Sequence, residues 1–482
     1  MKPTQFSLAK IIGLVLGPLL FFLVQVLAPA SMLSPEAWKV IGIAAWMITW
    51  WITEAAPIPV TAMLPMILFP LSGIFNITEA TAPYAHPIIF LFMGGFMLGL
   101  AMEEHNLHKR VALNLIKLTG TNPNGIILGF MLTTAFISMW ISNTATTVMM
   151  LPIALSMTSL LGTADSEDKG TRRFALSLMI GIAYAANIGG TATIIGTPPN
   201  VAWVGFMSDM SATEIEFGQY LKVGLPTCAI MLFIAYFLLT RVMYPSKINQ
   251  LSGSAQVIDD QLKALGPFSR AEKLVTVIFV LTALSWILRG TINNWIGTNL
   301  LNDTVIAIAG GTLMFITPLR LKEGEFLMKW NATQRLPWGI LLLFGGGMSL
   351  ARAMESVNIV QDIGDAIAGN GDANPLLLII GLTAFMLFMT EVMSNIALTV
   401  IFIPVVLGIA SSMGMDPIHL SLPVTLAASY AFMMPISTPP NAIVFSSGMI
   451  RMKDMIRAGF LLNIIAILLL ALLSQTLIPW VY

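Results

Sequence analysis

The chain has 482 residues and no formal net charge at pH 7; 56% of its residues are hydrophobic and only 10% are charged. Soluble domains carry about 25% charged residues, so the composition excludes an ordinary soluble protein. The zero net charge argues against a nucleic-acid partner, and the single cysteine, Cys228, excludes an internal disulfide framework. We therefore expect an all-α polytopic membrane protein surrounded by lipid.

Apolar stretches long enough to cross about 30 Å of hydrocarbon recur along the whole chain. We expect about eleven transmembrane helices, at residues 10–29, 40–55, 57–75, 86–103, 174–208, 218–243, 273–288, 300–318, 337–354, 419–449 and 458–478. Two further apolar regions, 125–160 and 373–412, are too long for one crossing, and each has a polar break at its middle. They are predicted to be re-entrant helical hairpins, which enter and leave the membrane on the same side.

The charged residues indicate the orientation of these helices, because Lys and Arg collect in cytoplasmic loops. If the N-terminus is inside, the inner loops hold most of the bases, including Lys109, Arg172 and Arg320, and the outer loops hold acids such as Glu214 and Asp362. The pattern predicts an integral protein of the plasma (inner) membrane with a cytoplasmic N-terminus and an external C-terminus.

Parts of the first half of the chain are repeated in the second half. LFMGGFMLGLAMEEHNL at 91–107 resembles LFGGGMSLARAMESVNI at 343–359, an offset of 252 residues. The same offset relates ISNTATTVMMLP at 141–152 to MSNIALTVIFIP at 393–404. On the predicted topology the two hairpins open to opposite sides of the membrane, so we expect an inverted repeat.

A third match marks two broken helices. IIGTPPNVAWVGF at 194–206 resembles PISTPPNAIVFSS at 435–447, and the two prolines in each stretch interrupt a helix. The ends of broken helices present N–H groups with partial positive charge and carbonyl groups with partial negative charge. Inverted repeats with broken helices are typical of secondary transporters, whose site lies at the repeat interface.

The polar residues at these breaks favour an anion bound together with a cation. Asn, Ser and Thr can contact either one, and no Lys or Arg lies in either hairpin, in 174–205 or in 419–449. An anion would then be held by helix ends, amides and bound cations, which is a physical basis for symport. Oxygen ligands without paired carboxylates suit Na⁺ better than Ca²⁺.

The paired SNT-type hairpin tips and TPPN breaks resemble those of the divalent anion:sodium symporter family, which carries dicarboxylates, citrate or sulfate. The resemblance extends over essentially the whole chain. It implies a homodimer with an elevator mechanism, in which a transport domain moves through the membrane against a fixed scaffold. The scaffold would comprise 1–118 in the first repeat and 271–355 in the second; the transport domain would comprise 119–270 and 356–482, each with one hairpin and one broken helix.

The resemblance also implies the ligands of this site. One sodium ion would lie among Ser138, Ser142, Asn143 and Gly196, and a second among Thr390, Asn395 and Ser437. The substrate would contact Asn143, Thr144, Thr197, Pro198, Asn395, Thr438 and Pro439.

Two residues depart from the repeated pattern. The second tip of the family usually repeats the threonine, but this chain has Ile396, which removes a hydroxyl from a site where such groups decide specificity. Either the substrate is a longer or less symmetric dicarboxylate, or it has one apolar end, or Thr399 or water compensates. Glu391 replaces the counterpart of Met139. It either strengthens the second cation site, or titrates and gives proton dependence, or is satisfied by neighbouring helix ends.

The predicted function is sodium-coupled symport of a divalent anion, with a C4-dicarboxylate such as succinate, malate or fumarate ranked first. The alternative is a sodium-independent or proton-coupled anion exchanger for citrate, tartrate or sulfate. An enzyme is not expected, because four His, one Cys and no clustered acids in the spans leave no catalytic constellation. A channel would need a continuous pore with rings of ligands, whereas inverted hairpins favour alternating access.

Overall fold

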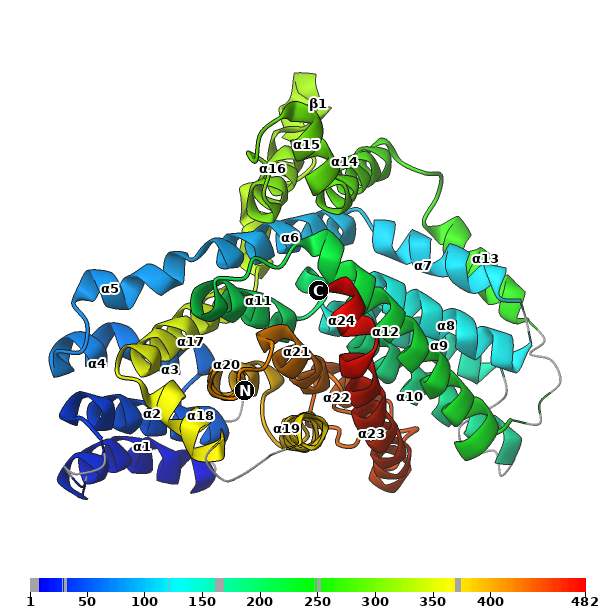
Figure 1. Ribbon diagram of the computed structural model, residues 1–482. Helices are drawn as coiled ribbons and strands as arrows, with labels where there is room; N and C mark the ends of the chain where they lie inside the picture. The colour runs from blue at the N-terminus through cyan, green and yellow to red at the C-terminus, as the bar shows by residue number, and fades with distance from the viewer. Residues whose placement is uncertain are drawn as a thin grey trace.

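The computed structural model of the protein describes residues 8–27, 29, 33–120, 122–160, 169–246, 248, 253–368 and 374–482. These residues are mainly helical (Figure 1). The sheet found among them is a two-stranded antiparallel ribbon of β1 (Pro318–Arg320) and β2 (Glu325–Phe326). The predicted all-α class is therefore confirmed.

The helical segments of the first half are α1 (Leu8–Leu27), α2 (Pro35–Thr53), α3 (Ile58–Thr61), α4 (Leu64–Ser72), α5 (Ile77–Thr81), η1 (Ala82–Ala85), α6 (Pro87–Glu104), α7 (Leu107–Leu118), α8 (Pro123–Ser138), α9 (Asn143–Ser159), α10 (Lys169–Gly190), η2 (Ile194–Gly196), α11 (Pro198–Ser211), α12 (Phe217–Phe237) and η3 (Leu238–Met243). Those of the second half are α13 (Ser254–Ala264), α14 (Arg270–Ile287), α15 (Arg289–Ile296), α16 (Asp303–Ile316), η4 (Leu321–Glu323), η5 (Trp330–Arg335), α17 (Trp338–Ser356), α18 (Ile359–Ala368), α19 (Pro375–Thr390), α20 (Asn395–Ser412), α21 (Pro417–Ala428), α22 (Pro439–Phe445), α23 (Met452–Gln475) and α24 (Leu477–Val481).

Each of the eleven expected spans coincides with a helix or with a pair of helices. Among the described residues, six helical runs are long and apolar enough to cross a membrane, and two bent pairs, α14–α15 at 76° and α17–α18 at 70°, raise the number to eight. Several other apolar helices are shorter, because breaks and prolines divide them. The count of eleven crossings stays a prediction.

The repeat found in the sequence is also a repeat of secondary structure. The hairpin helices α8 and α19 begin and end at the same offset of 252 residues. Both begin with a capping asparagine followed by a proline: the side chains of Asn122 and Asn374 each accept a hydrogen bond from a backbone N–H of the first turn. An N-cap asparagine with proline at the first helical position fixes a helix start locally, so the same short motif gives the same boundary twice.

Helix α10 lies at the centre of one packed group. It contacts α8, α9, α12 and α22, while α20 contacts α11, α18 and α21. A second group places α6 against α16 and α16 against α14, with β1 beyond them at the top of Figure 1. In α10, 89% of the most apolar stretch is buried, whereas in α1 only 11% is buried. Helix α10 is therefore a core helix and α1 is peripheral.

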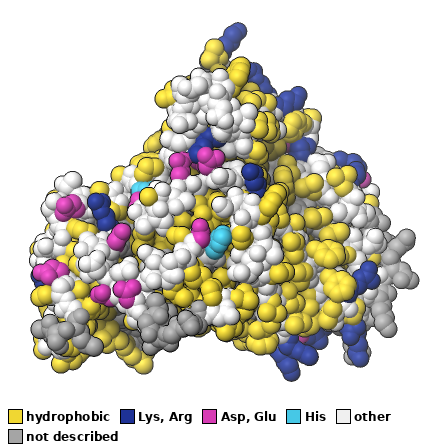
Figure 2. Space-filling model, viewed as in Figure 1, with side chains coloured by type: hydrophobic (Ala, Val, Ile, Leu, Met, Phe, Trp, Pro, Cys, Tyr) yellow, Lys and Arg dark blue, Asp and Glu magenta, His cyan; other side chains and the backbone are white. Residues whose placement is uncertain are grey.

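Hydrophobic side chains cover much of the face seen in Figure 2. Large apolar side chains are exposed on several of the candidate spans, among them Phe22 on α1, Phe233 on α12 and Leu468 on α23. Water would not favour such a surface, whereas hydrocarbon accommodates it. The exposed surface agrees with an integral membrane protein.

Candidate functional site

Each hairpin turns at a serine that caps the helix that follows. The Oγ of Ser142 accepts a hydrogen bond from a backbone N–H of α9 at 3.3 Å, and the Oγ of Ser394 accepts the equivalent bond from α20 at 3.5 Å. Serine is a favoured N-cap because its side chain satisfies an unpaired N–H. The caps make Asn143 and Asn395 the first residues of α9 and α20.

Each helix break is closed by the asparagine of its Thr-Pro-Pro-Asn motif. The Nδ2 of Asn200 donates to the carbonyl of Thr193 at 2.9 Å, and the Nδ2 of Asn441 donates to the carbonyl of Met434 at 3.0 Å. Each amide also reaches a second carbonyl on the helix side of the break. Since both asparagines are fully buried, they hold the broken ends together, and the preceding Thr-Pro pair is left on the cavity side.

The two tips and the two breaks meet at one cavity of about 400 Å³. The residues predicted to contact a substrate all line it: Asn143, Thr144, Thr197, Pro198, Asn395, Thr438 and Pro439. Ile396 also lies on the wall, as do Ser142 and Gly196 of the first predicted cation set. Segments about 250 residues apart in sequence therefore form one site.

The first predicted cation set surrounds a close approach of oxygen atoms. The Oγ of Ser138 lies 2.6 Å from the Oδ1 of Asn143 and 2.8 Å from the carbonyl oxygen of Ala186. A Cβ atom at Gly190 would lie 2.7 Å from that Oδ1 and 3.1 Å from the carbonyl oxygen of Gly196, so glycine is required there. Three oxygens that share one hydroxyl proton fit a small hard cation.

The second predicted set is divided between two places. The Oγ1 of Thr390 donates to the carbonyl of Ala428 at 2.9 Å, and the Oγ of Ser437 lies 2.6 Å from a carboxylate oxygen of Glu391. Thr390 and Ser437 are both buried behind the cavity wall, whereas Asn395 lies on the wall itself. The structure thus gathers Thr390 and Ser437 around Glu391.

Glu391 is a buried carboxylate with many donors. Its oxygens accept hydrogen bonds from the backbone N–H groups of residues 432, 433 and 434 at 2.8, 2.9 and 3.1 Å. The Oγ of Ser437 and the Nδ2 of Asn463, the latter at 2.8 Å, complete the set. These donors supply hydrogen bonds to both carboxylate oxygens. The geometry agrees with the interpretation in which neighbouring helix ends satisfy Glu391.

Three polar residues of the cavity wall lie outside the hairpin tips and outside the Thr-Pro-Pro-Asn breaks. Arg335 and Glu103 lie on the wall, and Arg335 pairs with Glu104. The hairpins and breaks themselves contain no basic residue, so this guanidinium was not expected at the site; it arrives from η5 through packing against α6. Asn187 on α10 is the third, and an asparagine within the apolar run of that helix was the available signal.

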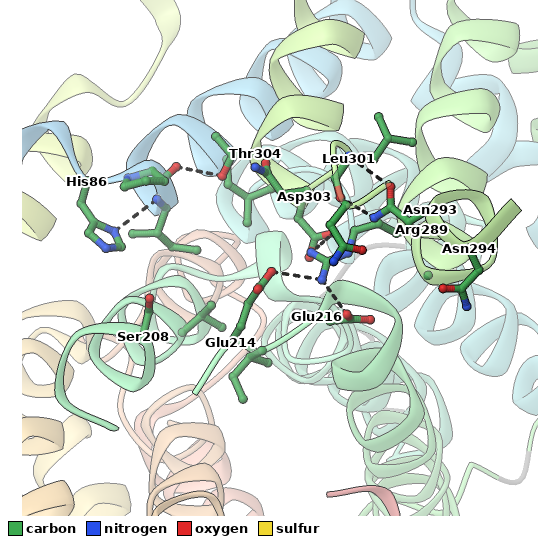
Figure 3. Close-up of a pocket in the computed structure, with 18 residues that line it drawn as sticks. His86, Ser208, Glu214, Glu216, Arg289, Asn293, Asn294, Leu301, Asp303 and Thr304 are labelled. Carbon is green, nitrogen blue, oxygen red and sulfur yellow. Dashed lines mark hydrogen bonds and ion pairs between the residues drawn. The ribbon is translucent and has the colours of Figure 1, made fainter. Parts of the chain in front are cut away.

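A larger cavity, of about 680 Å³, surrounds Arg289 (Figure 3). The buried guanidinium lies 2.6 Å from Glu216, 3.0 Å from Glu214 and 3.2 Å from Asp303. One guanidinium thus contacts three acidic side chains, and the cluster connects the loop before α12 to α15 and α16. None of the predicted site residues lines this cavity.

The chain is similar to known transporters over almost its whole length. The family model described as sodium:sulfate symporter transmembrane region matches residues 8–482. The sodium-dependent dicarboxylate transporter SdcS of Staphylococcus saprophyticus is 36% identical over 480 residues, which cover 98% of this chain and 92% of that protein. SdcS of Staphylococcus aureus is 38% identical over 483 residues, with 99% and 93% covered.

Two solved transporter structures share the fold. The YdaH transporter of Alcanivorax borkumensis gives a TM-score of 0.58 at 12% sequence identity, with 86% of this chain and 88% of that chain covered. MtrF of Neisseria gonorrhoeae gives 0.53 at 12% identity, with 86% and 83% covered. At this identity the likeness shows the fold alone. The family match and the relatives, however, show that this chain belongs to the sodium:sulfate symporter family, the sodium-coupled divalent anion transporters that its paired motifs resemble.

Proposed function

We propose that the protein is a secondary active transporter that couples the movement of a dicarboxylate to sodium ions. The observation that carries the proposal is the single cavity lined by both hairpin tips and both Thr-Pro-Pro breaks. The relatives are named sodium-dependent dicarboxylate transporters, which supports a C4-dicarboxylate such as succinate as the substrate.

The cavity suits an anion with two charged ends. Helices α9, α11 and α20 begin at its wall, at Asn143, Pro198 and Asn395. The first turns of α9 and α20 have unpaired N–H groups, whereas α11 begins with two prolines, which have no N–H. All three helices direct the positive end of the helix dipole toward the cavity, which favours anions. Arg335 adds one basic side chain to the wall and Glu103 adds one acidic side chain, whereas Glu104, which pairs with Arg335, does not line the cavity.

Asn143 connects the anion to the cation. Its Oδ1 belongs to the oxygen cluster with Ser138 and the carbonyl of Ala186, and the residue also lines the cavity. A sodium ion held by Oδ1 would fix the amide so that Nδ2 donates toward the anion. Cation and anion then bind more tightly together than apart, as coupled transport requires.

The moving parts of the transporter are also proposed. Residues 119–270 and 356–482 would form a transport domain that moves as an elevator within a homodimer, against a scaffold of 1–118 and 271–355. The two halves would be inverted, with an internal N-terminus and an external C-terminus. In this division, Arg289 belongs to the scaffold, and Glu214 and Glu216 belong to the transport domain. The ion pairs of Arg289 with Glu214 and Glu216 would therefore break when the transport domain moves.

Uptake into proteoliposomes tests the function. We expect an inward sodium gradient to drive saturable accumulation of labelled succinate, with competition by malate and fumarate. Equal uptake without sodium, or uptake driven by a proton gradient alone, would instead support the exchanger for citrate, tartrate or sulfate.

A further inference from the structure

Asn187 joins the first half of the chain to the break in the second half. It is 1% exposed and lies three residues before the end of α10. Its Nδ2 donates to the Oγ1 of Thr438 at 3.1 Å, with the carbonyl of Ala431 at 3.3 Å and the Oδ1 of Asn441 at 3.4 Å. Both Asn187 and Thr438 line the cavity.

These contacts fix the direction of the Thr438 hydroxyl. Its oxygen also accepts a hydrogen bond from the backbone N–H of Asn441 at 3.4 Å. A hydroxyl has two acceptor lone pairs and one proton, so the two donors leave Thr438 only its proton to offer. Within the described parts of the chain no acceptor takes that proton, and the hydroxyl borders the cavity. Thr438 is therefore prepared to donate to whatever occupies the cavity.

The matching threonine of the first half, Thr197, has no such support. It precedes α11 as Thr438 precedes α22, but its side chain makes no capping bond. No side chain among the described residues donates to its oxygen. The second half is also the half in which Ile396 removes a hydroxyl from the hairpin tip. The second half therefore lines the cavity with fewer hydroxyl groups than the first, and its hydroxyl at Thr438 is held in a single orientation.

We propose that Asn187 is a positioning residue, which fixes Thr438 as a hydrogen-bond donor to an ionised carboxylate bound in the second half of the cavity. The inference rests on the proposed function and narrows its substrate class. A fixed donor favours an ionised carboxylate, because a hydrogen bond to a charged acceptor is stronger than one to the neutral carbonyl of an ester. An apolar end offers no acceptor and leaves the donor unpaired. The end of the substrate bound in the second half is therefore an ionised carboxylate, and the donor at Thr438 compensates for Ile396.

A double-mutant cycle on the full-length protein tests this inference. Sodium-driven succinate uptake is measured for the wild type, Asn187→Leu, Thr438→Val and the double variant. Each single variant should raise the KM for succinate by about tenfold, because each removes the same hydrogen bond to a charged group. The double variant should be no worse than Thr438→Val. The sodium concentration for half-maximal uptake at saturating succinate should stay within about twofold of wild type.

Asn187→Asp provides an isosteric second variant. An aspartate would accept the Thr438 proton and turn it away from the cavity, and its charge would repel the substrate, so the KM should rise further than in Asn187→Leu. The rise should be smaller in the Thr438→Val background, where only the charge acts. Monomethyl succinate, with one end esterified, should compete poorly with succinate in the wild type and relatively better in both Asn187 variants.

If the KM increases of an Asn187 variant and of Thr438→Val simply multiply in the double variant, Asn187 does not act through Thr438. Unchanged discrimination against monomethyl succinate in the Asn187 variants would also overturn the proposed role of Asn187. If Asn187→Leu does not fold, the Asn187→Asp cycle decides by the same criterion. Wild-type protein that takes up no succinate would instead overturn the proposed function itself.

Discussion

The two hairpins have the same backbone plan and different chemistry. Both turn at a capping serine, and both place an asparagine at the start of the second helix on the cavity wall. At the tip, the first hairpin has Thr144 where the second has Ile396. Just before the turn, the first has Met139 where the second has Glu391. The repeat therefore preserves the positions of helix ends while the side chains around them differ.

The difference at Glu391 follows from the shape of the second break. In the first break, the N–H groups of Thr191 and Ala192 donate to carbonyls of α10, at 3.1 and 3.0 Å. In the second, the matching N–H groups of Phe432 and Met433 donate to Glu391. A carboxylate thus replaces the carbonyls of a helix turn, and it brings a negative charge beside Thr390 and Ser437. If the second predicted cation set binds sodium at Thr390 and Ser437, we expect it to bind more strongly for this reason.

The asparagines at the two hairpin tips, Asn143 and Asn395, are the feature that the two halves share, and their loss should reduce transport most. Asn143→Ala and Asn395→Ala should each reduce sodium-driven succinate uptake more than 100-fold, because each removes an amide from the cavity wall. Asn143 also belongs to the proposed cation site. Initial rates in proteoliposomes measure this. Asn114→Ala, which changes an exposed asparagine on α7, is the matched control and should transport normally. Near-normal uptake by either tip variant would remove that half from the site.

Loss of the charge at Glu391 should affect the second hairpin more than a matched change affects the first. Glu391→Gln removes the charge and faces an NH₂ group toward other donors, so it should lower the stability by about 3 kcal/mol and raise the sodium concentration for half-maximal uptake by about tenfold. Thermal unfolding and uptake at varied sodium measure the two. The matched change in the first hairpin, Met139→Leu, conserves volume and should cost less than about 1.5 kcal/mol. Equal behaviour of the two variants would refute the electrostatic asymmetry.

The tip residues should give effects of a few fold. Ile396→Thr adds a hydroxyl beside the cavity, so the KM for succinate should fall by about threefold and the order of competition among malate, fumarate and tartrate should change. The reciprocal change, Thr144→Ile, should raise the KM. An unaltered competition order in both variants would exclude these positions from specificity.

The smallest effect concerns the boundary between the proposed domains. Glu214 is 70% exposed and pairs with Arg289 across that boundary, and exposed ion pairs contribute little, about 0–1 kcal/mol. Glu214→Gln should therefore change the maximal uptake rate by no more than about threefold and leave the KM for succinate unaltered. Glu323→Gln, in an exposed pair with Arg320 on one side of the boundary, should change neither. A rise in KM for Glu214→Gln would place the cluster in substrate binding.

Much of the site could be predicted because its signals are local and occur twice. A capping serine or a Thr-Pro-Pro-Asn stretch fixes a helix end within a few residues, and duplication identified both copies. The resemblance of these motifs to the symporter family implied the seven substrate contacts, and all seven residues line one cavity. Arg335 and Asn187 could not be assigned in this way. Their positions depend on how η5 packs against α6 and how α10 meets the second break, and such contacts between distant segments leave no periodic pattern.

The number of membrane crossings could not be predicted from local sequence signals either. Short helices such as α3, α4 and α16 have spans that composition alone does not settle, because breaks and prolines divide the apolar runs. The fold class, which depends on composition over the whole chain, needed no such detail.

In the proposed transport mechanism, one cavity binds a dicarboxylate and sodium together. Succinate binding to the purified protein can be measured by titration calorimetry in sodium and again in an equal concentration of potassium. We expect saturable binding in sodium, with affinity that rises as sodium is raised, and no detectable binding in potassium. Equal affinity in the two salts would contradict the account.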